Sequence, residues 1–308
     1  MTHPELSPIP KKRGGLLKRF LTTLVALAYF ITMCFWGAPA YCVGVTIVVG
    51  LGLAEFVYAF GSEAEKRTGN PYTPINLLNS AIGWSGLGLP AFAWQISVKN
   101  PSIALGYGVF LVVIVGFFSI LTLRSLLIGK ALGIIGQRAY GIIGAVYVGG
   151  LFSSFDLLRS LPGKITVFPF GSGDRGAWWM LCAAVCVWAT DTCAYFVGKT
   201  LGRNPLCPSL SPGKTVEGSI GGFLGAVIAG AVFGLWVHLP VQHGLAIGVI
   251  AGLVGQIGDL FESALKREIG MKDFGRLMPG HGGMLDRADS LLFSIPLAYL
   301  YLRLFAGG

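Results

Sequence analysis

Apolar runs of about 20 residues recur along the chain, and they constrain its fold more than any other feature. A run of this length is what an α-helix needs to cross the hydrocarbon core of a bilayer. The run lengths predict about nine spans, at 18–38, 41–60, 74–94, 103–123, 139–158, 176–197, 218–237, 242–261 and 287–305. Charged residues make up 12% of the 308 residues, about half of the 25% that is usual in soluble domains. The sequence therefore predicts an all-α, polytopic membrane helix bundle.

The chain divides by hydropathy into three parts: a basic N-terminus (1–19), N-terminal transmembrane helices (20–160) and C-terminal transmembrane helices (161–308). The first apolar run could also belong to a signal peptide cleaved near Ala38-Pro39-Ala40. That run is longer than a signal-peptide core and continues almost directly into a second span. We therefore expect the first run to be a span.

The distribution of basic residues predicts the orientation. Loops on the N-terminal side of the membrane, alternating with spans, hold 18 of the 23 basic residues. Basic loops remain in the cytoplasm, so the N-terminus and the loops at 199–217 and 263–286 are expected there, in a multi-pass protein of the plasma (inner) membrane. The same clustering explains the net charge of +9 without nucleic acid as a partner. The six cysteines include no CxxC pair and are interpreted as small apolar residues.

Acidic side chains inside apolar spans are costly and usually mark function. Glu55, Asp191, Asp259 and Glu262 lie within or at the end of such runs. The last three lie near the expected cytoplasmic ends of their spans, beside the basic loops. Glu55 stands apart, and we expect it to have a helix-end or interhelical hydrogen-bonding role.

Polar residues are densest between Gly258 and Asp289. Asp259 and Glu262 share a helix face, as do Asp286 and Asp289, and a glycine-rich loop lies between the two pairs. Carboxylates without thiolates suit Mg²⁺, which commonly binds one or two carboxylates together with substrate phosphates. Glycines in the loop allow backbone N–H groups to approach an anion.

A second polar segment runs from Ser211 to Gly218 and contains the string Gly213-Lys214-Thr215. It resembles the end of a P-loop, but the earlier glycine and the preceding strand are missing, which argues against a Walker fold. A basic, hydroxyl-rich turn leading into a helix can nevertheless bind phosphates through side chains and the helix N-terminus.

These motifs together resemble the phosphatidate cytidylyltransferase (CDP-diacylglycerol synthase) family. The family signature is matched by Ser263, Lys266, Arg267, Lys272, Asp273, Gly275, Pro279, His281, Gly282, Gly283, Asp286, Arg287 and Asp289. Met278 and Ala288 depart mildly from it. The segment 211–218 matches a second family element, with Val216 in place of a frequent tryptophan, and Asp191, Ala194, Tyr195, Gly198 and Lys199 match a third. The matches cover about the C-terminal 120 residues; earlier spans agree only in hydropathy.

The resemblance implies that CTP and phosphatidate react to give CDP-diacylglycerol and pyrophosphate, with Mg²⁺ as cofactor. For this reaction we expect catalytic roles for Asp259, Lys266, Arg267, Asp286 and Arg287. Asp259 and Asp286, which lie at two adjoining span ends, are also expected to hold the metal. The resemblance predicts substrate contacts for Asp191, Lys199, Ser211, Lys214, Thr215, Glu217, Glu262, Ser263, Lys272, Asp273, His281, Gly282, Gly283 and Asp289. A second metal or a monovalent cation, and a homodimer formed through glycine-rich spans, stay open.

Other functions remain as alternatives. A CTP-dependent polyprenol or phytol kinase would share the nucleotide chemistry but should match the 263–289 pattern less well. A secondary transporter would show paired interrupted spans near the midplane, whereas the acids here gather at one side. A structural membrane scaffold would need no such polar loop.

Overall fold

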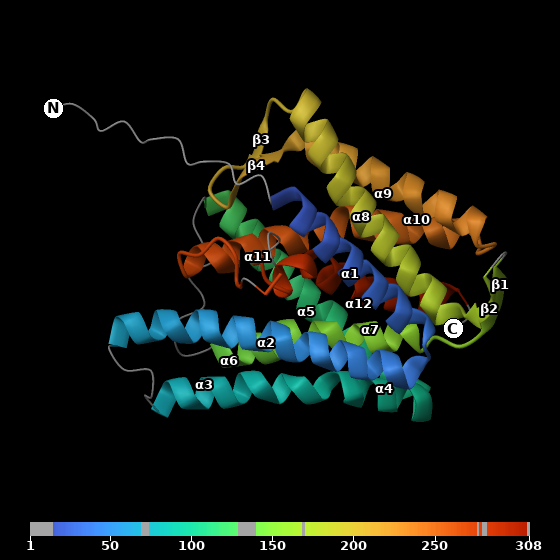
Figure 1. Cartoon of the computed structure of the whole chain (residues 1–308), viewed down its shortest axis with the longest axis horizontal. Helices are drawn as coiled ribbons and strands as arrows, with labels where there is room; N and C mark the ends of the chain where they lie inside the picture. Colours follow the sequence, from blue (N-terminus) through green and yellow to red (C-terminus); the bar gives the residue numbers. More distant parts are fainter. Residues whose placement is uncertain are drawn as a thin grey trace.

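The computed structural model describes residues 15–68, 74–128, 140–167, 170–275, 277–278 and 282–306. It is a bundle of helices that pack side by side (Figure 1). The helices are α1 (Gly15–Phe35), α2 (Ala38–Thr68), α3 (Pro74–Ser85), α4 (Leu89–Lys99), α5 (Pro101–Ile128), α6 (Tyr140–Ile143), α7 (Leu151–Arg159), α8 (Arg175–Leu201), α9 (Val216–Trp236), α10 (Val241–Ile250), α11 (Gln256–Glu268) and α12 (Asp289–Phe305). Each predicted span overlaps at least one of these helices.

Within the described residues, six helical segments are long and apolar enough to cross a membrane: Ala38–Glu63, Pro101–Leu127, Tyr140–Arg159, Arg175–Leu201, Val216–Trp236 and Val241–Glu268. The chain is therefore a multi-pass, all-α membrane protein, but the predicted count of nine spans is not confirmed. The remaining expected spans are shorter or interrupted: α12 has 17 residues, and a 3₁₀ turn, η1 (Gly86–Gly88), separates α3 from α4.

Two further helices contain π-helical segments. η2 (Gly144–Gly150) joins α6 to α7, and η3 (Ala251–Gly255) joins α10 to α11. Such segments in helices often accompany functional sites because they change the direction of the side chains that follow. Here η3 ends four residues before Asp259, and η2 contains Tyr147, whose hydroxyl contacts Glu262.

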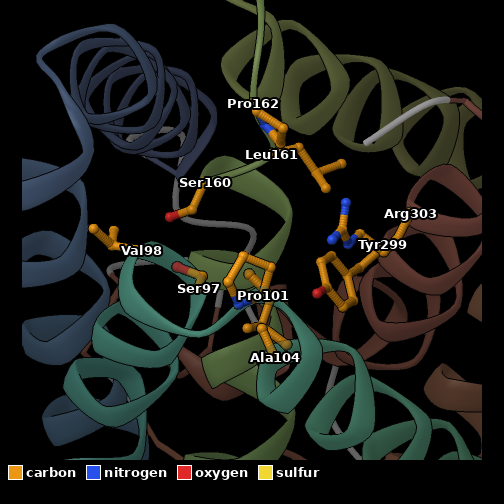
Figure 2. A pocket seen from close by; sticks show the side chains of 10 residues that line it. Ser97, Val98, Pro101, Ala104, Ser160, Leu161, Pro162, Tyr299 and Arg303 are labelled. Atoms are coloured by element: carbon orange, nitrogen blue, oxygen red, sulfur yellow. The ribbon is translucent and has the colours of Figure 1, made fainter.

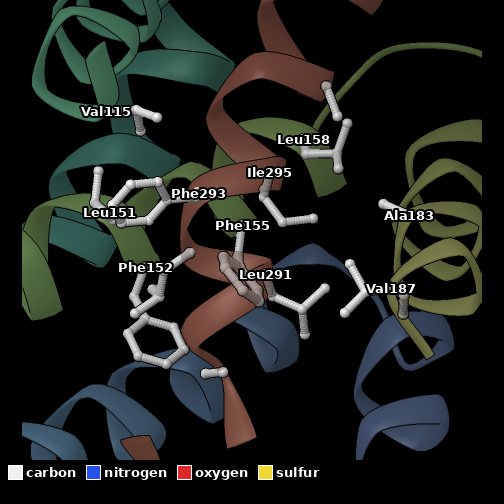
Figure 3. Packing of buried hydrophobic residues seen from close by; sticks show 14 of the residues in the cluster. Val115, Leu151, Phe152, Phe155, Leu158, Ala183, Val187, Leu291, Phe293 and Ile295 are labelled. Carbon is white, nitrogen blue, oxygen red and sulfur yellow. The ribbon is translucent and has the colours of Figure 1, made fainter. Parts of the chain in front are cut away.

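The core lies where α5, α7, α8 and α12 meet (Figure 3). Phe293 on α12 and Leu151 on α7 are fully buried there, as is Ala183 on α8. Buried residues from α2 also belong to this cluster, so the two predicted transmembrane parts share one core. The division at 160 remains a prediction.

Glycines on α9 allow it to pack closely against α8. A Cβ at Gly218 would lie 2.8 Å from the Ala194 carbonyl oxygen, and one at Gly222 would lie 2.8 Å from that of Thr190. In a lipid environment helix association depends on such close packing. Gly218 and Gly222 are therefore packing residues between α8 and α9.

Two antiparallel hairpins, which the all-α prediction did not include, lie between helices. β1 (Lys164–Val167) pairs with β2 (Gly171–Asp174), and β3 (Pro205–Cys207) pairs with β4 (Ser211–Thr215). They lie at different ends of the bundle: β3, β4 and α11 are toward the left and top in Figure 1, whereas β1, β2 and the C-terminus are at the right. The left end carries the polar motifs.

Candidate active site at one end of the bundle

The centre of the polar end is a buried ammonium held between two carboxylates. Lys266 Nζ on α11 lies 3.0 Å from Glu262 Oε1 and 2.8 Å from Asp286 Oδ1. The two carboxylate side chains are 0% and 3% exposed, and that of Lys266 is 12% exposed. Tyr147 donates a hydrogen bond to the other Glu262 oxygen at 3.2 Å. These charged side chains are shielded from water, so they need one another as partners, because an unpaired buried charge is strongly unfavourable.

Asp286 also organises the backbone of its own loop. Its Oδ2 accepts the N–H of Gly283 at 2.8 Å and that of Phe274 at 3.1 Å. Burial raises the pKa of Asp286, but the Lys266 ammonium and these hydrogen bonds outweigh that effect and hold the pKa below its ordinary value of 3.8. Asp286 is therefore ionised at neutral pH, and its oxygens accept hydrogen bonds from Lys266, Phe274 and Gly283.

A second ion pair lies in a more open position. Lys214 Nζ, on β4, is 2.5 Å from Asp259 Oδ2 on α11, and both side chains are 29% exposed. The carboxylate of Asp191, exposed on α8, interacts electrostatically with both members of this pair and with Arg287. Asp289, on the first turn of α12, interacts with Asp259 and Asp191. Three helices and a hairpin thus bring acids and bases together where charged substrates can reach them.

Three predicted site residues make structural hydrogen bonds. Thr215 caps α9 by accepting the Gly218 N–H at 3.1 Å. Glu217 accepts the N–H of Arg203 at 3.1 Å and the Asn204 side-chain amide at 2.6 Å, which fixes the hairpin against α9. Arg267 donates to the carbonyl oxygens of Leu210 and Met271, both at 3.1 Å. These contacts position Lys214 and the polar loop.

Among the other predicted residues that the structure describes, Lys199 has its ammonium 5.6 Å from the ring centroid of Tyr195, and the carbonyl oxygen of Gly282 accepts the Met278 N–H at 2.9 Å. Lys272 and Asp273 are exposed, whereas Ser211 and Ser263 are half-buried. Gly282 has a φ of +88°, a conformation that favours glycine. His281 lies outside the described residues.

Sequence reasoning missed several contacts. For Glu55 the sequence predicted a helix-end or interhelical hydrogen bond but not the partner. Its carboxylate accepts the backbone N–H of Leu285 at 3.2 Å. Gln256 links α11 to α9 by exchanging hydrogen bonds with Ser219. Asp156, which no motif includes, is 1% exposed, and its carboxylate oxygens have no hydrogen-bond partner in the described part of the chain. The sequence signal that could have identified Asp156 was its position inside the expected span 139–158.

The fit of Mg²⁺ follows from the donor set. Within the described ranges no three His, Cys, Asp or Glu side chains form a ready metal-binding group. Mg²⁺ usually takes only one or two protein carboxylates and keeps substrate phosphates and water as its other ligands, so a smaller set suffices. Asp259, with Asp191 and Asp289 nearby, presents accessible oxygens of this type. The residues fit the ion.

A cavity of about 320 Å³ lies at the opposite end of the bundle (Figure 2). It is formed where α4, α7 and α12 end and α5 begins, and Ser160, Tyr299 and Arg303 are among its lining residues. The acidic and basic residues of the motifs do not line it. The cavity and the polar end are therefore separate features.

The comparisons with known proteins agree with the motifs. The model of the cytidylyltransferase family matches residues 17–305. The phosphatidate cytidylyltransferase of Bacillus subtilis (strain 168) is 42% identical over 166 residues, 53% of this chain and 58% of that relative. That of Staphylococcus epidermidis (strain ATCC 12228 / FDA PCI 1200) is 38% identical over 168 residues, 54% of this chain and 59% of the relative. These two alignments span somewhat more than half of each relative's length.

A third relative aligns along nearly all of its length. The phosphatidate cytidylyltransferase of Staphylococcus aureus (strain COL) is 31% identical over 288 residues, which are 92% of this chain and 98% of the relative. The similarity thus includes α1 to α7, where the sequence motifs gave no guidance. The chain belongs to the cytidylyltransferase family.

Proposed function

We propose that this protein transfers the cytidylyl group of CTP to phosphatidate, giving CDP-diacylglycerol and pyrophosphate for phospholipid biosynthesis. The observation that carries the proposal is the convergence of Lys214, Asp259, Lys266 and Asp286 at one end of a membrane bundle. Lys214, Lys266 and Asp286 lie at positions of the family pattern, and relatives of this chain are named phosphatidate cytidylyltransferase.

The reaction needs positioning more than it needs a strong base. A phosphate monoester has a second pKa near 6, so the phosphatidate phosphate is largely a dianion at neutral pH. One of its oxygens forms a bond to the α-phosphorus of CTP, and the bond from that phosphorus to the oxygen bridging to the β-phosphate breaks. The bond electrons leave with pyrophosphate. The site must therefore bring two polyanions together and stabilise charge on the leaving group.

The basic residues of the open part of the site suit that requirement. Lys214 starts from an ion pair with Asp259, and a bound triphosphate offers it stronger anionic partners. Arg287, exposed beside Asp191, provides a second cation. Lys266 is engaged by two buried carboxylates, so its contribution is to hold Asp286 and its loop in place. Such electrostatic interactions are stronger in a partly buried site than in water.

The metal belongs to the same proposal. Asp259 and Asp286 would hold Mg²⁺ together with the phosphates of CTP; the exposed carboxylate of Asp259 is the more accessible of the two. When bound, the ion supplies positive charge that polarises the phosphates and stabilises the leaving group. We further propose the plasma membrane as the location, with the polar end cytoplasmic, because basic residues gather in the loops of that end. The proposal also includes a homodimer, in which glycine-rich spans of two copies would pack together.

The test is an assay of the purified protein in detergent micelles with CTP and Mg²⁺. Pyrophosphate release should require phosphatidate and should match the CDP-diacylglycerol formed. A polyprenol or phytol kinase would instead release CDP and phosphorylate an isoprenoid alcohol. Formation of CDP without pyrophosphate, or turnover that is independent of phosphatidate, would refute the proposed function.

A further inference from the structure

Glu55 joins the N-terminal half of the bundle to the polar loop. It lies on α2, 230 residues away in sequence from Leu285, whose backbone N–H it accepts at 3.2 Å through Oε2. The backbone N–H of Met284 is also close enough to stabilise this carboxylate electrostatically. Its other oxygen, Oε1, is buried and has no hydrogen-bond partner in the described part of the molecule. The carboxylate is therefore directed into the loop and away from water.

Two glycines leave room for this carboxylate. A Cβ at Gly275 would lie 2.5 Å from Glu55 Cδ, and a Cβ at Gly283 would lie 2.7 Å from the same atom. Both distances are shorter than real Cβ contacts allow. The backbone φ angles of Gly275 and Gly283 are not in the left-handed region. A side chain at either position would therefore displace the Glu55 carboxylate, whereas no turn conformation calls for glycine there.

The same loop is held from its other side by Asp286. The Gly283 N–H donates to Asp286 Oδ2 at 2.8 Å, and Asp286 in turn binds Lys266. Glu55 therefore contacts the backbone at 284–285. These two residues lie between Gly283 and Asp286, which are themselves joined by a hydrogen bond. A shift of this turn would move Asp286 and the adjacent Arg287 together.

We infer that Glu55 is a positioning residue for the cytidylyl-transfer site, acting through the backbone of the 283–287 turn. The expected effects on kcat and KM rest on the proposed function. The expected effect on how firmly the loop is held does not. The function required of Glu55 is to accept the backbone N–H groups, and a neutral carbonyl oxygen can do this as well as a carboxylate. Glutamine should therefore replace it, and alanine should not.

The kinetic test compares Glu55→Ala and Glu55→Gln with the wild-type protein. Misplacement of catalytic groups by about 1 Å lowers rates about 100-fold, so the alanine variant should lose kcat on the order of 100-fold. Its KM for CTP should change by a smaller factor than kcat, because Lys214 and Asp259 lie on β4 and α11, outside the turn. The glutamine variant should retain kcat within about fivefold, since it keeps the acceptor oxygen. Thr46→Ala is the matched control: it removes a hydrogen bond that stays within α2 and should leave both constants unchanged.

A coupling test checks the contact itself. Gly283→Ala should lower kcat strongly when Glu55 is present, because the new methyl group meets the carboxylate. In the Glu55→Ala background that obstruction is absent, so the same substitution should have a much smaller further effect. Fully multiplicative effects of the two substitutions would overturn the inference.

A third readout is independent of catalysis. Limited trypsin digestion of the folded protein should cut after exposed Lys272 faster in Glu55→Ala than in the wild-type, Glu55→Gln or Thr46→Ala proteins, because the loop is less firmly held. If the wild-type protein lacks cytidylyltransferase activity, the proposed function fails while this digestion still tests Glu55. Equal cleavage rates in all four proteins, or an equal loss of kcat in the alanine and glutamine variants, would overturn the inference.

Discussion

Substituting Lys266 by methionine tests whether the buried charge network holds the polar end together. Methionine is similar in length and apolar, so the main change is the loss of the ammonium. Glu262 would keep its hydrogen bond from the Tyr147 hydroxyl, whereas Asp286 would keep the N–H groups of Gly283 and Phe274. Glu262 is 0% exposed, and so it is the group that the substitution affects most.

The magnitude follows from burial. Removing one member of a buried ion pair destabilises a protein by about 3–5 kcal/mol. We expect about 3 kcal/mol here, at the lower end of that range, because Asp286 retains two backbone donors. For a large domain 1 kcal/mol corresponds to a change in Tm of about 2–4 °C. The Tm of Lys266→Met should therefore fall by roughly 6–12 °C.

Thermal unfolding in detergent, followed by the fluorescence of the seven tryptophans, measures this difference. Lys214→Met is the matched control, since it also breaks a lysine–carboxylate pair, but one whose side chains are each 29% exposed. Exposed pairs contribute about 0–1 kcal/mol, so its Tm should fall by less than about 4 °C. Adding Glu262→Gln to Lys266→Met should restore part of the lost stability, because no ionised Glu262 is then left unpaired. Equal shifts in the two lysine variants would refute the reasoning.

Four further outcomes are expected. Asp259→Asn should abolish most turnover and raise the Mg²⁺ concentration for half-maximal activity; normal activity with unchanged Mg²⁺ dependence would exclude Asp259 as a ligand. Because the pKa of Asp286 is lowered, its stabilising effect is complete above its ordinary value of 3.8 and is lost as the pH falls through the lower folded value; acidification below 3.8 should therefore reduce the Tm of the wild-type protein more than that of Asp286→Asn. Single-turnover rates should rise with pH through about 6 and then level off, and His281→Gln should keep the shape of this limb; its disappearance would identify a histidine base. Cysteines placed at exposed positions 213 and 272 should resist impermeant reagents applied to intact cells, and rapid labelling there would reverse the proposed orientation.

The sequence by itself determined the class of the protein. Apolar runs report which segments leave water, and this depends only on local composition. The motif residues likewise identified the family, because the spacing of Lys266, Asp286 and their neighbours is a linear property of the chain. The sequence also predicted that Asp191 and Asp259, the acids of spans six and eight, lie toward the same end of the bundle, and in the structure their carboxylates are close enough to interact electrostatically.

The tertiary structure alone decided which charges pair. Asp259 and Asp286 look equivalent in the sequence, yet one lies in an open pair with Lys214 and the other is buried against Lys266. The difference arises because η3 and the packing of α11 against α12 set which face of each helix turns inward. The contact of Glu55 with Leu285 had no local signal, since it joins residues 230 positions apart. Burial and the partner of a charge are properties of the assembled bundle, and hydropathy along one segment does not contain them.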